Sequence, residues 1–250
     1  MKILDFVKEM KQKATRELLA VSEGGKCIEK TYTFQKGQAE IITICGGAIE
    51  KAAITHLILK SVKAPGTDVE LDGMVYQMEI FPENPYCPMG HFNTEWRKGD
   101  TVTYYMNLDL FPAVDIKEEL DTVKGIMDGV ADQFGRDKTA IREGLGEQYN
   151  MAHWSFPLAA KVGCQLKELK ESDLDLFTTA YHTFFNAYLD ILRKKKNTHF
   201  NEEEQRHKLQ RNGKWLEYIT LKDRAVKMAL ATGIPPEIII KLSYPPSAVF

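Results

Sequence analysis

Hydrophobic positions along the chain change their period from helical to strand-like and then back to helical. Between residues 3 and 20, apolar side chains recur at three- and four-residue steps, and they would form one buried face: Ile3, Phe6, Val7, Met10, Ala14, Leu18 and Leu19. The period then becomes two, which is typical of strands because successive side chains point to opposite faces of a sheet. The pattern therefore predicts one amphipathic helix followed by a sheet.

Short strand-like runs follow one another through the middle of the chain. Strands are predicted over residues 27–34, 39–45, 53–62, 74–81, 92–96 and 101–108. A short Lys-Gly turn separates the first two runs, which predicts a hairpin. Because these short strand-like runs succeed one another, we expect a largely antiparallel meander.

The last part of the chain is predominantly helical by the same criterion. Helices are predicted over residues 116–134, 172–196, 201–209 and 236–242. Ser172 and Asn201 are suitable N-caps for the second and third of these, and Pro236 suits the first turn of the last. Residues 214–221 alternate instead and predict a strand. The fold class predicted is one α+β domain over 1–250, with helices packed on a central antiparallel sheet.

Composition and charge narrow the classes of protein that fit this pattern. The 250 residues are 44% hydrophobic, which is enough for a substantial core, and the formal net charge of -2 gives no global attraction to nucleic acid or to an anionic membrane. No run approaches the roughly 20 apolar residues that span a bilayer, and the first residues lack the apolar segment of a signal peptide. We therefore expect a soluble cytoplasmic protein that binds no nucleic acid and spans no membrane.

Polar side chains gather on one face of the two strands predicted over 92–96 and 101–108. If these strands pair, that face carries His91, Asn93, Glu95, Tyr105, Asn107 and Asp109, whereas the other face carries Phe92, Trp96, Tyr104, Met106 and Leu108. The second set is typical of a core. The polar set is either a solvated outer surface or the floor of a ligand cavity. The proline-flanked borders at 84–88 and 110–112 are unusually constrained, which favours the cavity.

Common signatures of metal, nucleotide and nucleophile chemistry are missing from the sequence. The four cysteines form no C-x-x-C pair, and neither H-E-x-x-H nor a three-histidine pattern occurs. There is no G-x-G-x-x-G segment or P-loop, and no serine or cysteine nucleophile motif. The sequence therefore gives no support for a metal site, and we expect none.

Two segments carry a more specific pattern. N-P-Y-C-P-M-G-H-F-N over 84–93 and D-L-F-P over 109–112 resemble the N-P-x-x-P-x-x-H-x-N and D-L-T-P segments of the oxygen-dependent coproporphyrinogen III oxidase family. Similar blocks follow in the same order, including R-N-G-K-W-L-E-Y over 211–218, D-R over 223–224 and L-S-Y-P-P over 242–246. The chain therefore resembles a divergent member of this family over most of its length.

The resemblance implies a fold and a reaction. The family fold is a large, flat antiparallel sheet sandwiched between layers of helices, with a deep cleft for a tetrapyrrole, and its members form homodimers. Family members oxidatively decarboxylate two propionates of a porphyrinogen in haem biosynthesis, with O2 as oxidant and no metal or organic cofactor.

The resemblance also implies roles for individual residues. Asp109 is expected to accept hydrogen bonds from the pyrrole N–H groups and to stabilise the positive charge that develops as the ring loses electrons. His91 is expected to assist proton transfer, because imidazole exchanges protons near neutral pH. The expected substrate-binding residues are Asn93, Glu95, Tyr105, Asn107 and Arg224.

Departures from the family pattern leave the substrate open. Glu95 and Pro235 stand where the family has arginines, and 105–107 replaces a glycine triplet. Arginine grips carboxylates with a fork of N–H donors, and each lost charged hydrogen bond is worth roughly 1.5–3 kcal/mol. Weaker binding of a four-carboxylate substrate is expected. The alternatives are a relative acting on a modified porphyrin or a linear bilin, and a non-catalytic tetrapyrrole-binding protein.

Overall fold

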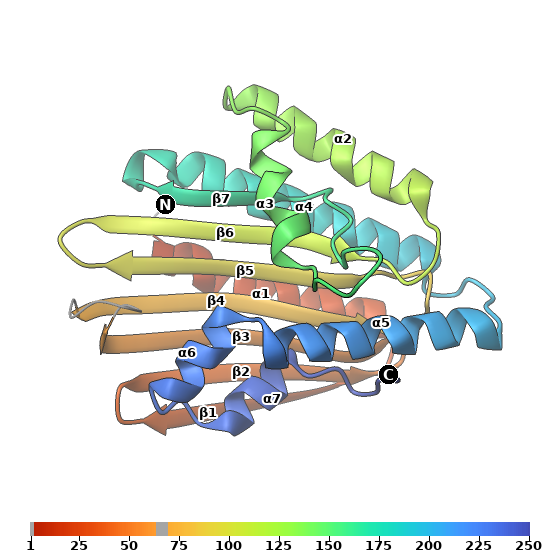
Figure 1. The fold of residues 1–250 in the computed structure, drawn as a ribbon, viewed down its shortest axis with the longest axis horizontal. Helices are drawn as coiled ribbons and strands as arrows, with labels where there is room; N and C mark the ends of the chain where they lie inside the picture. Colours follow the sequence, from red (N-terminus) through yellow and green to blue (C-terminus); the bar gives the residue numbers. More distant parts are fainter. Residues whose placement is uncertain (1–2, 64–69) are drawn as a thin grey trace.

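A seven-stranded antiparallel sheet forms the centre of the molecule, and each strand pairs with the next along the chain. The computed structural model describes residues 3–63 and 70–250 (Figure 1). The strands are β1 (Lys26–Phe34), β2 (Gly37–Gly46), β3 (Ile49–Lys63), β4 (Glu70–Pro82), β5 (Met89–Lys98), β6 (Val102–Phe111) and β7 (Cys164–Leu169). The predicted meander of antiparallel strands is confirmed.

Helices cover both faces of this sheet. They are α1 (Ile3–Ser22), α2 (Lys117–Gln133), α3 (Glu143–Gln148), α4 (Leu174–Lys195), α5 (Glu202–Leu221), α6 (Arg224–Ala231) and α7 (Pro236–Ser243). In the view of Figure 1, α1 and α4 lie behind the sheet, whereas α3, α5, α6 and α7 lie in front of it. The α+β fold class, a sheet sandwiched between helix layers, is confirmed. No described helix is both long and apolar enough to cross a membrane.

The rear face of the sheet packs against α1 and α4 through large apolar side chains. The ring of Phe92 on β5 lies 5.2–5.8 Å, centroid to centroid, from four rings of α4: Tyr181, Phe184, Phe185 and Tyr188. Phe6 and Met10 of α1 are fully buried in the same cluster. Burial of apolar area is the main favourable contribution to folding, so this layer is the principal core.

The segment before β5 is anchored to the connection between α4 and α5. The side-chain amide of Asn84 donates to the carbonyl oxygens of Lys196 and Thr198, at 3.2 and 2.6 Å, and its oxygen accepts from the Tyr86 N–H at 2.9 Å. Gly90 packs so closely on Tyr188 that an added Cβ would lie 2.8 Å from the ring. These contacts fix the position at which β5 enters the sheet.

Two sequence predictions about the C-terminal half are wrong, and three elements there were not predicted. Residues 214–221 were expected to form a strand and instead continue α5, because the buried positions repeat at helical steps: Lys208, Arg211, Asn212, Trp215, Tyr218 and Ile219. Ser172 does not cap α4; it lies in a 3-10 turn, and the N-cap position is Asp173. Strand β7 and helices α3 and α6 were not predicted. The N-cap at Asn201 is confirmed, since its side chain accepts from the Glu204 N–H at 3.0 Å.

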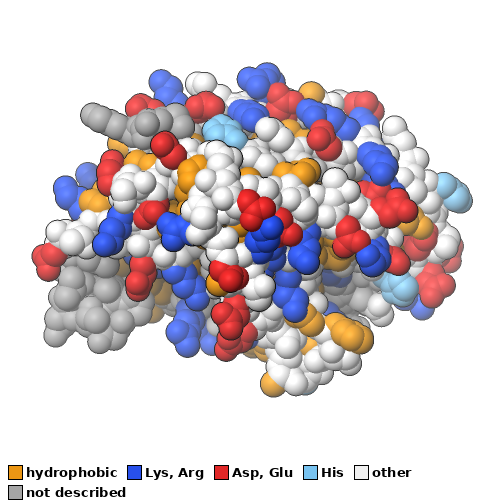
Figure 2. Space-filling view, turned by 90° about the horizontal axis from the view of Figure 1, so that it is seen from above, with side chains coloured by type: hydrophobic (Ala, Val, Ile, Leu, Met, Phe, Trp, Pro, Cys, Tyr) orange, Lys and Arg blue, Asp and Glu red, His pale blue; other side chains and the backbone are white. Residues whose placement is uncertain are grey.

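Both signs of charge are mixed on the surface above β7 and α2, as Figure 2 shows. Helix α2 also takes part in ion pairs that have a buried member. Glu119 of α2 is 6% exposed and pairs with Lys194 and Lys195 at the end of α4, at 2.6 and 3.0 Å. Burial opposes ionisation of Glu119, but the two ammonium groups outweigh it and lower its pKa from 4.5 to about 2. The pair therefore joins α2 to α4 most strongly when Glu119 is ionised.

Replacing this carboxylate should weaken the packing of α2. Because the folded-state pKa lies below the unfolded-state value, the stabilisation is complete above pH 4.5 and is lost as the pH falls toward 2. We expect Glu119→Gln to lower the free energy of unfolding by roughly 1 kcal/mol at pH 7 and to have little further effect near pH 2. Urea unfolding at both pH values measures this. Glu118→Gln, at an exposed neighbouring position, is the control, and equal effects of the two changes would contradict the assignment.

Candidate functional site

Strand pairing brings the predicted polar residues together on the front of the sheet. In one row Glu79, His91 and Asp109 lie opposite one another on β4, β5 and β6. The next row runs from β3 to β7 through Thr55, Gln77, Asn93, Asn107 and Gln165, and Glu95 lies opposite Tyr105 in a third. We call these ten residues the polar floor. The expectation that the six predicted side chains share one sheet face is confirmed.

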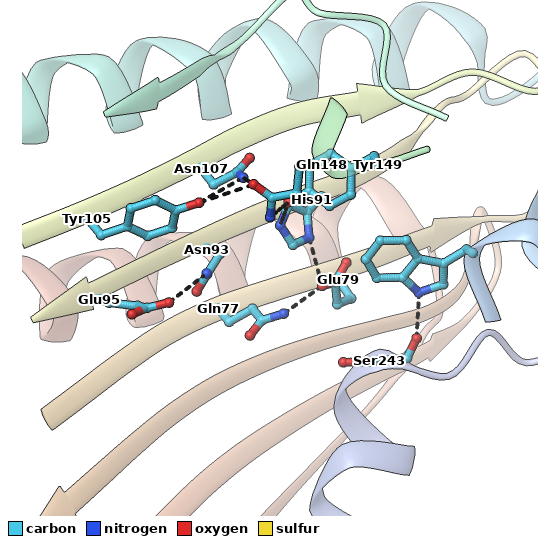
Figure 3. Close-up of polar contacts among 11 residues, drawn as sticks. Gln77, Glu79, His91, Asn93, Glu95, Tyr105, Asn107, Gln148, Tyr149 and Ser243 are labelled. Atoms are coloured by element: carbon cyan, nitrogen blue, oxygen red, sulfur yellow. Dashed lines mark hydrogen bonds and ion pairs between the residues drawn. The ribbon is translucent and has the colours of Figure 1, made fainter. Parts of the chain in front are cut away.

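His91 is held between a carboxylate and a phenol (Figure 3). Its Nδ1 lies 2.8 Å from Glu79 Oε1 and its Nε2 lies 2.7 Å from the Tyr149 hydroxyl. Burial raises the pKa of Tyr149 well above its usual value, so the phenol keeps its proton and can donate it to Nε2. Nδ1–H then donates to Glu79. The ring packs against Phe111 and Trp215, at centroid distances of 5.9 and 5.6 Å.

A second group of hydrogen bonds links the floor to α3. The side-chain oxygen of Gln148 accepts from Asn107 Nδ2 at 3.0 Å and from the amide of Gln165, while its nitrogen lies 3.3 Å from the Tyr149 hydroxyl. The Tyr105 hydroxyl accepts from the same two amides, at 3.1 and 3.2 Å. Gln148 and Tyr149 therefore form a roof over one side of the floor.

Asp109 is fully buried and both of its oxygens are engaged. Oδ2 accepts from the Lys161 N–H at 2.9 Å, and Oδ1 accepts from the N–H groups of Val162 and Gly163, at 2.9 and 3.2 Å. Burial raises the pKa of Asp109, and these backbone donors oppose the rise. A Cβ on Gly163 would lie 2.0 Å from the Leu108 carbonyl oxygen, so the loop is packed tightly on β6. In this arrangement the carboxylate holds the start of β7.

Glu95 lies in an ion pair at the more open end of the floor. Arg97 Nε donates to its Oε2 at 3.0 Å, and Asn93 Nδ2 donates to its Oε1 at 3.3 Å. The Arg97 side chain is 57% exposed. The chain thus carries a guanidinium at this end of the floor, and Glu95 neutralises it.

Several polar side-chain atoms of the floor have no hydrogen-bond partner within the described residues. They are Glu79 Oε2, Asn93 Oδ1, Asn107 Oδ1 and Thr55 Oγ1, all buried. A buried polar atom without a partner destabilises a fold by about 1–3 kcal/mol, and a ligand that supplies donors to these atoms would remove that cost. The floor is therefore suited to a molecule that presents several N–H or O–H groups.

A comparison with protein-family models identifies the family. The model described as coproporphyrinogen III oxidase matches residues 3–250. The chain belongs to the coproporphyrinogen III oxidase family. Within this family's fold, the motif histidine and asparagine at 91 and 93 lie on β5 and the motif aspartate at 109 lies beside them on β6.

Not every predicted site residue joins the polar floor. Arg224 opens α6 and its side chain is exposed, and no hydrogen bond or ion pair connects it to the floor among the described residues. A surface groove of about 480 Å³ lies elsewhere, at the start of α5, and is lined by Phe200, Asn201, Glu202, Gln205, Arg206, Leu209 and Val249. None of the predicted site residues of this family member lines that groove. Within the described ranges, no group of three or more His, Cys, Asp or Glu side chains is arranged to hold a metal ion.

Two pairs of residues in the polar network around His91 were not predicted as site residues from the sequence. Gln77 and Glu79 could have been found, because alternation over 74–81 places them on one face and antiparallel pairing then brings that face beside His91. Gln148 and Tyr149 had no such signal. They come from α3 and the residue after it, which were not predicted, and only the fold brings them over β5 and β6.

The geometry around His91 predicts one imidazole tautomer. The proton should reside on Nδ1, and Tyr149→Phe should remove the donor to Nε2 and lower the free energy of unfolding by about 1–2 kcal/mol. Nitrogen chemical shifts of the His91 ring in ¹⁵N-labelled protein would report the tautomer before and after the change. Tyr244→Phe is a suitable control, because Tyr244 is only partly buried and has no hydrogen bond to His91. A proton on Nε2 in the unaltered protein would refute the arrangement.

Proposed function

We propose that this family member is an oxidoreductase that decarboxylates propionate side chains of a porphyrinogen in haem biosynthesis, with O2 as the electron acceptor. For each propionate, the carbon next to the ring loses a hydrogen with its electron pair and the bond to the carboxyl carbon breaks. The electron pair of that bond forms the vinyl double bond, and CO2 is released. O2 takes up two electrons and two protons and leaves as H2O2.

One observation supports this proposal. The polar floor has several oxygen atoms without a partner, whereas its amide N–H donors are already bonded within the protein. A porphyrinogen presents four pyrrole N–H groups, and the unpartnered oxygens of Asn93 and Asn107 can accept from them. The positive charge that develops on a pyrrole as hydrogen leaves with its electrons is stabilised by nearby carboxylates. The floor supplies these from Glu79 and Glu95.

We assign the propionate carboxylates to the exposed rim of the site. Arg97 donates to Glu95, which also accepts from Asn93, and its guanidinium can form two parallel hydrogen bonds to a carboxylate. Arg224, exposed in the first turn of α6, stays a proposed second contact. We also propose a homodimer, which the family resemblance supports, and a cytoplasmic location.

The test is aerobic incubation of the purified chain with coproporphyrinogen III. We expect a product with vinyl groups, together with one CO2 and one H2O2 for each propionate lost. The same incubation without O2 is the control and should give no product. Binding of the substrate without any aerobic turnover at high protein concentration would contradict the proposal and favour a tetrapyrrole carrier.

Removing the charge at position 95 should strengthen substrate binding. In Glu95→Gln the guanidinium of Arg97 loses its internal partner and becomes free to bind a propionate, so KM should fall about 3- to 10-fold, in line with a gain of roughly 1 kcal/mol. Arg97→Gln should raise KM by a similar factor. Steady-state kinetics of both variants measure this.

Lys98→Gln serves as the control for a general change of charge, because Lys98 is exposed on the same strand and has no contact with Glu95. A KM that rises in Glu95→Gln would show that Glu95 contributes an attractive contact instead.

A further inference from the structure

We propose that Glu79, and not Asp109, is the carboxylate that accepts the ring N–H donors of the substrate, and that Asp109 is a positioning residue. The inference rests on the proposed function and names the group that recognises the centre of the ligand. It reverses the role that the family resemblance implied for Asp109.

Both oxygens of Asp109 already accept hydrogen bonds from the backbone. Three backbone N–H groups of residues 161–163 donate to its two oxygens at 2.9–3.2 Å, and the residue is 0% exposed. To bind a pyrrole N–H, the carboxylate would have to give up donors that fix the loop before β7. That loop leads directly to Gln165, which donates to Tyr105 and Gln148. Asp109 thus acts on the floor through the backbone that it holds.

Glu79 has the opposite arrangement on the neighbouring pair of strands. Its Oε1 lies 2.7 Å from Gln77 Nε2 and 2.8 Å from His91 Nδ1, so both protein donors serve the same oxygen. The other oxygen, Oε2, is buried and has no partner among the described residues. A buried carboxylate oxygen without a donor is strongly unfavourable, so this oxygen is the atom of the floor that most requires a donor from a ligand.

The neighbours of Glu79 define how a ligand reaches it and what it presents. Gln77 and Asn93 lie in adjacent positions on β4 and β5 and are half-buried, so the approach is from their side of the floor. Together with Asn93 Oδ1 and Asn107 Oδ1, Glu79 Oε2 gives acceptors on three successive strands. This set fits a molecule with several N–H groups on one face. Tyr149 and His91 keep the Glu79 carboxylate oriented, because the phenol fixes the imidazole that donates to it.

Anaerobic binding of coproporphyrinogen III separates the two carboxylates without any requirement for turnover. By calorimetric titration we expect Glu79→Gln to weaken binding at least 10-fold while the circular dichroism spectrum is unchanged. Asp109→Asn should lower the melting temperature and, at a temperature where it is folded, bind within about 3-fold of the unaltered chain. Unchanged affinity in Glu79→Gln, or a 10-fold loss in folded Asp109→Asn, would overturn the assignment.

A second measurement uses the unaltered chain and does not depend on the variants folding. Infrared difference spectra are recorded on adding coproporphyrinogen III anaerobically to protein labelled with ¹³C in either its glutamate or its aspartate carboxyl groups. We expect a ligand-induced shift of a carboxylate band in the glutamate-labelled sample and none in the aspartate-labelled sample. The reverse result overturns the inference. Binding with these shifts but without aerobic product would reject the proposed reaction alone, whereas no binding would reject both.

Discussion

The hydrogen bond between the Glu79 carboxylate and the His91 imidazole is the contact on which the front of the molecule depends. Both side chains are almost completely buried, at 0% and 5% exposure. A buried carboxylate requires hydrogen-bond donors, and here Gln77 and His91 supply two of them to the same oxygen. Because the same imidazole bonds to Tyr149, this contact also connects the sheet to the residues that follow α3. The polar floor therefore forms one hydrogen-bond network with Gln148 and Tyr149.

The alternation of apolar and polar residues was enough to predict most of the sheet and the face that carries the polar floor. The period of two placed six strands and put His91, Asn93 and Glu95 on one face, since a one-residue error in register would have moved Phe92 out of the core. It failed at 214–221, where aliphatic stems and aromatic rings on both sides of a helix imitate alternation. Strand β7 is only six residues long, and α3 likewise, so neither carries enough repeats for a periodic signal.

The roles of individual side chains were less accessible than their positions. The family motif draws attention to Asp109, and its position in the polar row agrees with that. Which oxygens remain free depends on the backbone of 161–163, a loop that no local pattern links to β6. In the same way, the negative charge of Glu95 is offset by Arg97 through a contact along one strand face. A side chain can therefore bind a ligand only through the atoms that have no partner within the folded protein.

Family membership and floor chemistry together favour a tetrapyrrole that is held at its nitrogens by acceptors and at its propionates by a small number of cations. The departures from the family pattern alter the binding of the propionates more than the binding of the ring nitrogens. Asn93 keeps a buried oxygen free for a donor, whereas Arg97 is shared with an internal carboxylate. Substrate affinity should therefore depend more on the ring nitrogens than on the carboxylates.

Side-chain amide resonances report directly on whether the polar floor binds the tetrapyrrole. In protein with ¹⁵N-labelled asparagine and glutamine, coproporphyrinogen III would be titrated under nitrogen while the NH2 signals are followed. If the floor is the binding site, the signals of Gln77, Asn93 and Asn107 shift and that of Gln205, in the groove beside α5, stays in place. A shift of Gln205 with the three floor signals unchanged would contradict the assignment of the site.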